Sequence, residues 1–142
     1  MAVNFFTPKF YVLDNFSANA IDFEGKLYPT SEHAYQASKF TNTAHKEAIR
    51  QARSPKQAKQ LANVTYKNAR DPNWTDKKVG VMEQILRAKL AQHEETAKAL
   101  DDSGSEDIIE DSPTDYFWGE GADGSGHNQL GKLWMKLRAE RH

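Results

Sequence analysis

The stretch that decides the fold reads Pro29-Thr30-Ser31-Glu32-His33-Ala34-Tyr35-Gln36-Ala37-Ser38-Lys39-Phe40. Read as a helix, it offers the hydroxyl of Thr30 or Ser31 as an N-cap for a backbone N–H group of the first turn. Glu32, Gln36 and Lys39 then recur at three- and four-residue spacing. Because residues at this spacing are neighbours on a helix surface, the three polar side chains share one face.

This polar face has two interpretations. Tyr28, Tyr35 and Phe40 flank it, which favours a face that lines a cavity rather than one that meets bulk water. The alternative is an ordinary surface helix, since an acid in the first turn interacts favourably with the helix dipole. The spacing alone favours the ordinary helix, because short motifs often match by chance. The rest of the chain changes that balance.

The composition bounds the class of protein. The 142 residues predict a single domain, residues 1–142, with a core large enough to fold without disulfides or metal. Lys and Arg number 19 against 20 Asp and Glu, so no global field attracts nucleic acid, and any such contact is local. The chain has no cysteine, which excludes a disulfide framework, thiol catalysis and a Cys-based zinc site.

The sequence also carries expectations about location and assembly. No apolar run is long enough to cross a membrane, and the first residues lack the pattern of a signal peptide. We therefore expect a soluble cytoplasmic protein with no membrane contact. A monomer is the default expectation for its assembly.

The first thirty residues are aromatic and extended in character. Residues 4–6 are a strand candidate, and residues 20–23 and 26–28 form a predicted hairpin around Glu24-Gly25. A further short strand is predicted at Ile108-Ile109. Such short strands need helices to cover them.

Helical patterns fill most of the remaining chain, and the fold class is mainly α with a small β element (α+β). Ser54 and Pro55 begin one helix as N-cap and first residue. The longest helix, residues 74–93, repeats Val79, Met82, Ile85, Leu86 and Leu90 at the helical period. The other predicted helices cover residues 43–52, 94–100 and the segment that contains Leu130 to Leu137, with a basic loop over residues 66–73.

A glycine-rich segment, residues 113–131, precedes the last helix. Five of the eight glycines lie between Gly119 and Gly131. Glycines such as Gly119 and Gly124 allow backbone N–H groups to approach a ligand closely. Asn128 stands where an N-cap is expected, and the amides of a helix start bind anions, so we expect phosphate or pyrophosphate here.

Two motif matches in this segment are rejected. Gly119-x-Gly121-x-x-Gly124 matches the dinucleotide fingerprint, but no room remains for a following βαβ unit. The residues from Asp123 to His127 match a calcium loop poorly. Of the aromatic residues before the glycines, Phe117 is expected to anchor the loop and Trp118 to stack on a planar base.

The remaining candidates are single residues. The histidines at positions 33, 45, 93, 127 and 142 lack metal-ligand spacing, and we expect no metal. Trp74 is either a staple at a helix start or part of a base pocket. Arg87 and Lys89 on the long helix are either solvated or meet a phosphate.

Several of these motifs, taken in order, resemble the NADAR (YbiA-like) family. The resemblance rests on Asp14-Asn15-Phe16-Ser17, Tyr28-Pro29-Thr30-Ser31-Glu32-His33 with Gln36 and Lys39-Phe40, Leu86-Arg87-Ala88-Lys89-Leu90, Tyr116-Phe117-Trp118-Gly119 and Gly124-Ser125-Gly126-His127-Asn128-Gln129-Leu130-Gly131. It covers nearly the whole chain. It implies a single, mostly helical domain with the YbiA-like fold.

The resemblance also implies an activity, the hydrolysis of N-glycosidic bonds. The implied substrates are ribosylamino-pyrimidine or purine-like intermediates of riboflavin synthesis, or ADP-ribose attached to guanine in DNA or RNA. The family has in addition been linked to NAD and ADP-ribose metabolism. Ala34, Ser38 and the short segment 7–13 depart from the family pattern, which leaves the choice of substrate open.

Site residues follow from matching positions. The resemblance makes Glu32 the key acid and Lys39 a second catalytic candidate, and Asp123 is a possible second carboxylate from the glycine loop. The implied substrate pocket comprises Trp118 and the loop from Gly119 through Gly124 to Asn128, closed by Asn15, Phe16 and Ser17. Further candidates for substrate binding are His33, Gln36, Trp74 and Lys89.

Cleavage of a ribosyl C1–N bond passes through an oxocarbenium-like state and requires negative charge near C1. Glu32 can supply that charge and orient water. Lys39 can keep Glu32 ionised, donate to the substrate, or attack an opened ribose as an amine. We expect no cofactor. A non-catalytic module that binds ADP-ribose or a nucleotide, and a plain helical interaction domain, remain alternatives.

Overall fold

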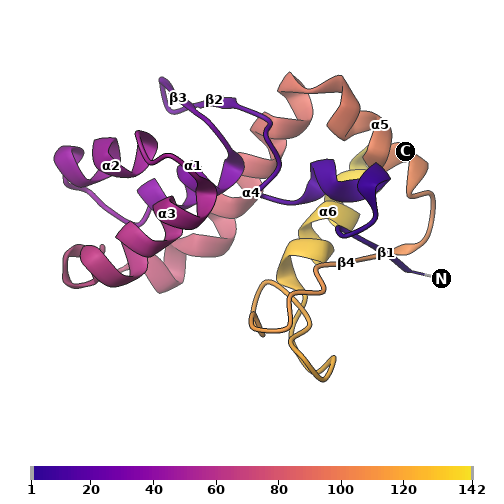
Figure 1. Cartoon of the computed structure of the whole chain (residues 1–142). Helices are drawn as coiled ribbons and strands as arrows, with labels where there is room; N and C mark the ends of the chain where they lie inside the picture. Colours follow the sequence, from indigo (N-terminus) through magenta and orange to yellow (C-terminus); the bar gives the residue numbers. More distant parts are fainter. Residues whose placement is uncertain (1, 142) are drawn as a thin grey trace. The chain divides into compact units, whose positions relative to one another are not determined.

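The computed structural model describes residues 2–141, and the chain forms two compact units. The terminal unit comprises Met1–Asp14 and His93–His142, and the central unit comprises Asn15–Gln92. Helices dominate both, so the prediction of a mainly helical fold with a small β element is confirmed (Figure 1). A single domain stays a prediction.

The central unit begins with the predicted hairpin. Strands β2 (Ile21–Phe23) and β3 (Lys26–Tyr28) pair in antiparallel fashion. Between them Glu24 and Gly25 have φ of 51° and 80°, the left-handed conformation that a two-residue turn of type I′ requires. The hairpin prediction is therefore confirmed.

Helix α1 (Ser31–Ala37) is the core of the central unit, because every one of its residues is buried. Thr30 caps it as predicted, with its hydroxyl accepting a hydrogen bond from the His33 amide at 3.2 Å. The helix ends earlier than Phe40. One further turn follows, in which the amide of Lys39 donates to the carbonyl of Gln36 at 3.2 Å.

Three helices pack with α1 in this unit: α2 (Thr43–Arg50), α3 (Pro55–Gln60) and α4 (Trp74–Gln92). Ser54 is the N-cap of α3, as predicted, and accepts from the amide of Gln57 at 3.0 Å. The chain continues through a π-helical turn, η2 (Leu61–Thr65), and a 3-10 turn, η3 (Lys67–Ala69).

The buried stripe of α4 differs from the predicted one. Met82, Ile85 and Leu86 are buried, but Val79 is exposed. Lys89 is buried on this helix, whereas Leu90 is only partly covered. A hydrophobic pattern alone could not place a lysine at a core position.

Strand β1 (Ala2–Asn4) of the terminal unit runs parallel to β4 (Asp107–Ile109). The strand predicted at Ile108-Ile109 is confirmed, but the one predicted over residues 4–6 lies two residues earlier. The side chain of Asn4 accepts hydrogen bonds from the amides of Phe6 (3.1 Å) and Thr7 (3.2 Å). Such an Asx turn ends the strand at Asn4.

The extended character expected of the N-terminal residues is wrong for η1 (Pro8–Leu13), which forms a 3-10 helix with proline at its start. This helix packs with α5 (Glu94–Asp102), and α6 (Gln129–Glu140) packs with β4. The indole of the fully buried Trp134 donates to the carbonyl of Leu13 at 3.0 Å. These contacts form the core of the terminal unit.

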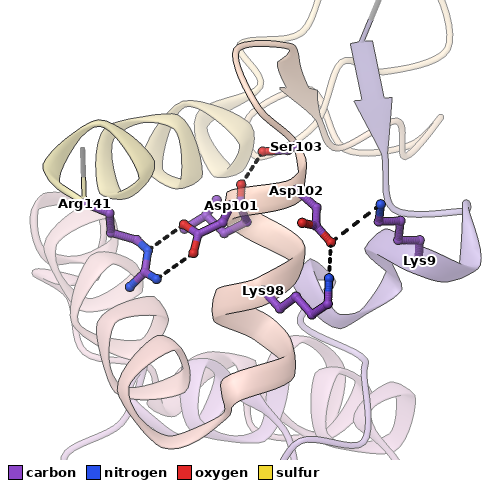
Figure 2. Close-up of polar contacts among 7 residues, drawn as sticks. Lys9, Lys98, Asp101, Asp102, Ser103 and Arg141 are labelled. Atoms are coloured by element: carbon purple, nitrogen blue, oxygen red, sulfur yellow. Dashed lines mark hydrogen bonds and ion pairs between the residues drawn. The ribbon is translucent and has the colours of Figure 1, made fainter.

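Ion pairs stabilise the surface of the same unit, as Figure 2 shows. Arg141 binds the carboxylate of Asp101 through two hydrogen bonds of 2.8 Å. Asp102 pairs with Lys98 at 2.7 Å and with Lys9 at 3.6 Å. Within residues 2–141, no helix has both the length and the apolar character needed to span a membrane.

Candidate functional site

A buried polar cluster in the central unit contains Glu32, Gln36 and Lys39. Glu32 is 7% exposed and Lys39 is 8% exposed. The side-chain amide of Gln36 donates to Oε2 of Glu32 at 2.5 Å, as one helical turn between them allows. Charged groups are buried only at considerable cost, so this face is not that of an ordinary surface helix.

Asn15 fixes the start of α1 against this cluster. Its backbone carbonyl accepts a hydrogen bond from the amide of Glu32 at 3.0 Å. Its side-chain amide donates to the sulfur of Met82 at 3.3 Å. Oδ1 of Asn15 and Oε1 of Gln36 are buried acceptors that receive no hydrogen bond from residues 2–141, so both are available to the donors of a ligand.

The ammonium of Lys39 lies among both polar and aromatic groups. Nζ donates to Oδ1 of Asn63 at 2.9 Å and lies 5.2 Å from the centre of the Tyr35 ring. Burial lowers the pKa of Lys39 to about 8. The carboxylate of Glu32 opposes this shift, and the nearby cations Arg70, Lys59 and Lys78 add to it. Lys39 is thus an amine that titrates near neutral pH.

The basic loop after η2 contributes to this environment. Arg70 also reaches Oδ1 of Asn63, at 3.4 Å, and the amide of Asp71 donates to the carbonyl of Lys39 at 2.7 Å. Asn63 and Arg70 are not among the site residues predicted from the sequence. The clustered positive charge of residues 66–73 was a signal for Arg70, but nothing in the sequence distinguishes Asn63 from other helical asparagines.

His33 and Trp74 have structural partners. The two ring nitrogens of His33 lie 2.8 Å from the hydroxyl of Thr30 and 3.0 Å from the carbonyl of Ala52. Burial lowers the pKa of His33. Trp74 is buried and packs edge-to-face on Tyr35, with ring centres 5.3 Å apart. These contacts support positioning roles, and substrate binding by either residue stays a prediction.

Lys89 and Ser17 form a second buried polar group. Nζ of Lys89 donates to the hydroxyl of Ser17 at 2.8 Å, and that hydroxyl donates to the side chain of Asn19 at 2.6 Å. Lys89 has no exposed surface. It therefore ties the segment after Asn15 to α4, and a contact between Lys89 and a phosphate stays a prediction.

A groove opens on the central unit beside this cluster. Its lining residues are Phe16, Lys56, Lys59, Gln60, Asn63 and Val64. The groove has a volume of about 710 Å³, and we refer to it as the lysine groove. Asn63, which binds Lys39, also lines it.

The glycine-rich loop of the terminal unit folds tightly on itself. A side chain at Gly121, which has φ of 73°, would overlap the ring of Tyr116. A Cβ at Gly119 would lie 2.8 Å from the carbonyl of Glu110. By contrast, the space around Gly124 is open. These two close approaches explain why the loop needs glycine at positions 119 and 121 without reference to a ligand.

Asn128 does not cap α6 in the predicted manner. It adopts the left-handed conformation, with φ of 50°, and its side chain makes no capping hydrogen bond. That side chain instead bridges to β4, accepting from the amide of Glu110 and donating to the carbonyl of Ile108, both at 2.9 Å. The side chain of Asn128 therefore holds β4 in place and does not cap α6.

The amides at the start of α6 have protein partners, which corrects the expectation that they are available to an anion. The amide of Asn128 donates to the carbonyl of Gly119 at 3.0 Å. Those of Gln129 and Leu130 donate to the carbonyls of Phe117 (3.0 Å) and Trp118 (3.1 Å). A loop that returns along the helix start has satisfied these donors.

Trp118 and Asp123 are held by local contacts. The amide of Trp118 donates to the carboxylate of Asp115 at 2.8 Å, and its ring lies edge-to-face on Phe117 at 4.8 Å. The exposed carboxylate of Asp123 accepts from the hydroxyl (2.7 Å) and amide of Ser125, and the hydroxyl contact lowers the pKa of Asp123. Roles in base stacking and catalysis stay predictions.

Glu110 is a titratable residue that sequence analysis missed. Burial, and after it the nearby charges of Asp14, Asp111 and Asp115, raise the pKa of its carboxyl to about 8. Its carboxyl accepts from the amide of Ser112 at 3.2 Å. In the sequence, Glu110 only follows the apolar pair Ile108-Ile109, and nothing there indicates that the glycine-rich loop covers it.

The structure thus brings Asn15, Glu32, Gln36 and Lys39 together in the central unit. The loop candidates Trp118, Gly119, Gly124, Asp123 and Asn128 belong to the terminal unit. That Glu32 and Trp118 face one cavity stays a prediction.

Comparison with known proteins identifies relatives over most of this chain. N-glycosidase YbiA of Escherichia coli is 40% identical over 126 residues, which cover 89% of this chain and 78% of the relative. An N-glycosidase of Nostoc punctiforme is 35% identical over 131 residues, 89% of this chain and 82% of the relative. A riboflavin biosynthesis protein of Vibrio vulnificus is 38% identical over 90% of this chain but only 35% of its own length.

The fold has a counterpart of known structure. The solution NMR structure of E. coli YbiA matches 99% of this chain and 84% of its own, with a TM-score of 0.88 and 36% identity. The model of the NADAR domain matches residues 3–141. With a family match over nearly all its residues and relatives of this similarity, the chain belongs to the NADAR domain family.

Proposed function

We propose that this chain is an N-glycosidase that hydrolyses the C1–N bond between a ribosyl group and a base. Relatives named N-glycosidases at 35–40% identity support this class of reaction. The observation in the structure that carries the proposal is the buried face of Glu32, Gln36 and Lys39. Buried charges with titratable partners are typical of catalytic sites.

Glu32 is suited to stabilise the developing cation. As the C1–N bond breaks, its electron pair goes to the base nitrogen and positive charge develops on the ribosyl C1. The amide of Gln36 fixes one oxygen of the Glu32 carboxylate, so the negative charge has a defined position. Water then forms a bond to C1, and its proton goes to the leaving nitrogen.

Lys39 favours a second route to the same products. Because the pKa of Lys39 is about 8, its amine is neutral in about half of the protein molecules at pH 8. A neutral amine is a nucleophile. In a ring-opened substrate C1 is doubly bonded to the protonated base nitrogen, and Nζ can add to C1. The C1–N bond to the base then breaks, its electron pair and a proton from Nζ go to the base, and C1 becomes doubly bonded to Nζ. Water hydrolyses the resulting imine, which returns the amine and releases the sugar.

Two substrate classes fit the relatives. One is a phosphoribosylamino-pyrimidine intermediate of riboflavin synthesis, and a relative named for riboflavin biosynthesis supports it. The other is ADP-ribose attached to guanine in nucleic acid, which the family resemblance implies. In either case we propose that Phe16, which lines the groove beside the buried cluster, closes the site. Stacking of Trp118 on the base stays a prediction. A cytoplasmic location and a monomeric state stay predictions.

The experiment that tests the proposal is a chromatographic assay of both substrates. We expect the wild-type protein to release base and sugar from one of them, and Glu32→Gln to lose about 10²–10⁴ of that rate. Glu83→Gln, the same substitution at a surface ion pair of α4, is the matched control and should retain activity. Binding without product release would contradict the enzyme and leave a binding module.

A further inference from the structure

One face of α3 and η2 carries two lysines, Lys56 and Lys59, and lines the lysine groove. Lys56, Lys59, Gln60, Asn63 and Val64 follow one another at spacings of three, one, three and one, so they form a continuous helical stripe. They are exposed or half-buried. A stripe of this kind is often only a solvated helix face. Whether its lysines have partners within the protein indicates whether they are available to a ligand.

Lys56 and Lys59 of this stripe have no anionic partner among residues 2–141. Neither the side chain of Lys56 nor that of Lys59 forms a hydrogen bond or ion pair with any residue between positions 2 and 141. Some other exposed cations of the central unit are paired: Lys77 lies 2.7 Å from Asp71, and Arg87 lies 3.0 Å from Glu83. Lys59 instead repels Lys39, whose pKa it helps to lower.

The central unit as a whole also has an excess of positive charge, which favours the binding of an anion. The central unit carries 13 Lys and Arg against 7 Asp and Glu, whereas the terminal unit carries 6 against 13. The net charge of the whole chain is therefore nearly zero only because a strongly basic central unit is balanced by an acidic terminal unit. Locally concentrated positive charge raises the affinity of a surface for anions.

Asn63 connects the lysine groove to the buried cluster. It lines the groove, and its Oδ1 accepts a hydrogen bond from Lys39 at 2.9 Å. Apolar groups complete the groove, since Phe16 lines it and the side chain of Val64 is 67% exposed. A ligand in the groove thus meets cations, an amide and an aromatic ring next to the proposed reacting amine.

We propose that the lysine groove is a phosphate-binding subsite, in which Lys56 and Lys59 hold a phosphate of the substrate while its ribosyl C1 lies at Glu32 and Lys39. The inference rests on the proposed function and deepens it. Ammonium groups bind phosphate through charge-assisted hydrogen bonds, and Gln60 can donate a further one. Phe16 provides the wall against which the attached sugar or base packs.

The first test needs no turnover. Binding of inorganic pyrophosphate is measured by calorimetry for the wild-type protein, for Lys56→Gln/Lys59→Gln, and for the control Lys26→Gln/Lys67→Gln, which removes the same charge from the exposed lysines of β3 and η3. We expect the groove variant to weaken binding about five- to tenfold and the control less than twofold. Equal losses in both variants, or no loss, would overturn the subsite.

The second test identifies the source of the phosphate. Ribose 5-phosphate and a single-stranded ten-residue oligothymidylate are titrated into the same variants at several salt concentrations. A phosphate of a small substrate predicts that the groove variant weakens both probes by the same factor. A phosphodiester chain predicts a larger loss for the oligonucleotide, with a smaller salt dependence of its remaining affinity. If the variant binds both probes as the wild type does, the subsite is wrong.

These outcomes separate the subsite from the proposed activity. Loss of pyrophosphate binding in the groove variant, in a protein that cleaves no N-riboside, would retain the subsite and contradict the activity. Unchanged pyrophosphate binding in a protein that cleaves an N-riboside would retain the activity and contradict the subsite.

Discussion

Glu32 and Lys39 of the central unit are buried within one helical segment. In the terminal unit, Asp101 and Asp102 of α5 lie at the surface in ion pairs with Arg141 and Lys98 (Figure 2). Arg141 and Asp101 keep about a third of their side-chain surface exposed. Exposed pairs cost little to form and contribute little, but buried charges oppose folding. We attribute the burial of Glu32 and Lys39 to a function, whereas Lys89, which is also buried, is held by the hydroxyl of Ser17.

The substitution Lys39→Met tests most directly whether the buried charges of the central unit serve a function. We expect this substitution to reduce N-riboside hydrolysis by about 10³-fold, because it removes the titrating amine. Stability should rise at neutral pH. The folded-state pKa of Lys39, about 8, lies below the value of 10.5 for an unperturbed lysine, so the charged form opposes folding below pH 8.

Activity and the free energy of unfolding should therefore change in opposite directions, as measured by initial rates and by urea denaturation at pH 7. Lys98→Met is the matched control from the surface pair with Asp102, and it should change neither quantity by much. A large loss of stability in Lys39→Met would mean that the lysine is structural, and the contrast between the units would fail.

Glu110 is the exception within the terminal unit, because it is a shielded acid among other acids. Its folded-state pKa of about 8 lies above the usual value of 4.5. The stability it contributes is complete below pH 4.5 and is lost as the pH rises through 8. We expect the wild-type protein to lose on the order of 5 kcal/mol over this range through this group, since each pKa unit corresponds to about 1.4 kcal/mol.

Glu110→Gln should remove that part of the pH dependence, as thermal unfolding between pH 5 and pH 9 would measure. Glu106→Gln, on the loop before β4, is the control and should leave the slope unchanged. Parallel wild-type and Glu110→Gln curves would show that Glu110 ionises in the folded protein as it does in the unfolded chain.

The pH dependence of the rate distinguishes a nucleophilic role of Lys39 from an electrostatic one. If the neutral amine attacks C1, kcat/KM should rise about fivefold from pH 7 to pH 8 and then level off, because the neutral fraction grows from roughly a tenth to a half. Reduction with borohydride during turnover should trap a covalent adduct on Lys39. A rate that falls above pH 8, with no adduct, would assign an electrostatic role to the ammonium.

The helices of the central unit were readable from the sequence because local rules determine them. Thr30 and Ser54 cap their helices, and Glu24-Gly25 turns the hairpin, each with the predicted chemistry. The shared face of Glu32 and Lys39 follows from helical spacing in the same way. Local geometry was enough for these features.

Features that depend on contacts distant in the sequence were not readable. Asn128 does not cap α6 because its side chain is hydrogen-bonded to the backbones of Ile108 and Glu110, about twenty residues earlier. Lys89 occupies a core position because Ser17 is there to accept its hydrogen bond. Asn63 entered the site only through its contact with Lys39. No pattern of hydrophobic or capping residues encodes such pairings.

The smallest predicted effect lies in the surface pairs, at Asp101. Asp101→Ala removes both hydrogen bonds from Arg141, yet an exposed pair of this kind contributes only about 0.5 kcal/mol. We expect a loss of that size at low salt, measured by urea denaturation, and a smaller one at 1 M salt, where screening weakens the attraction. N-riboside hydrolysis should be unchanged. A loss above about 2 kcal/mol that persists in salt would place Asp101 with the buried charges, and exposure would then no longer separate structural charges from functional ones in this chain.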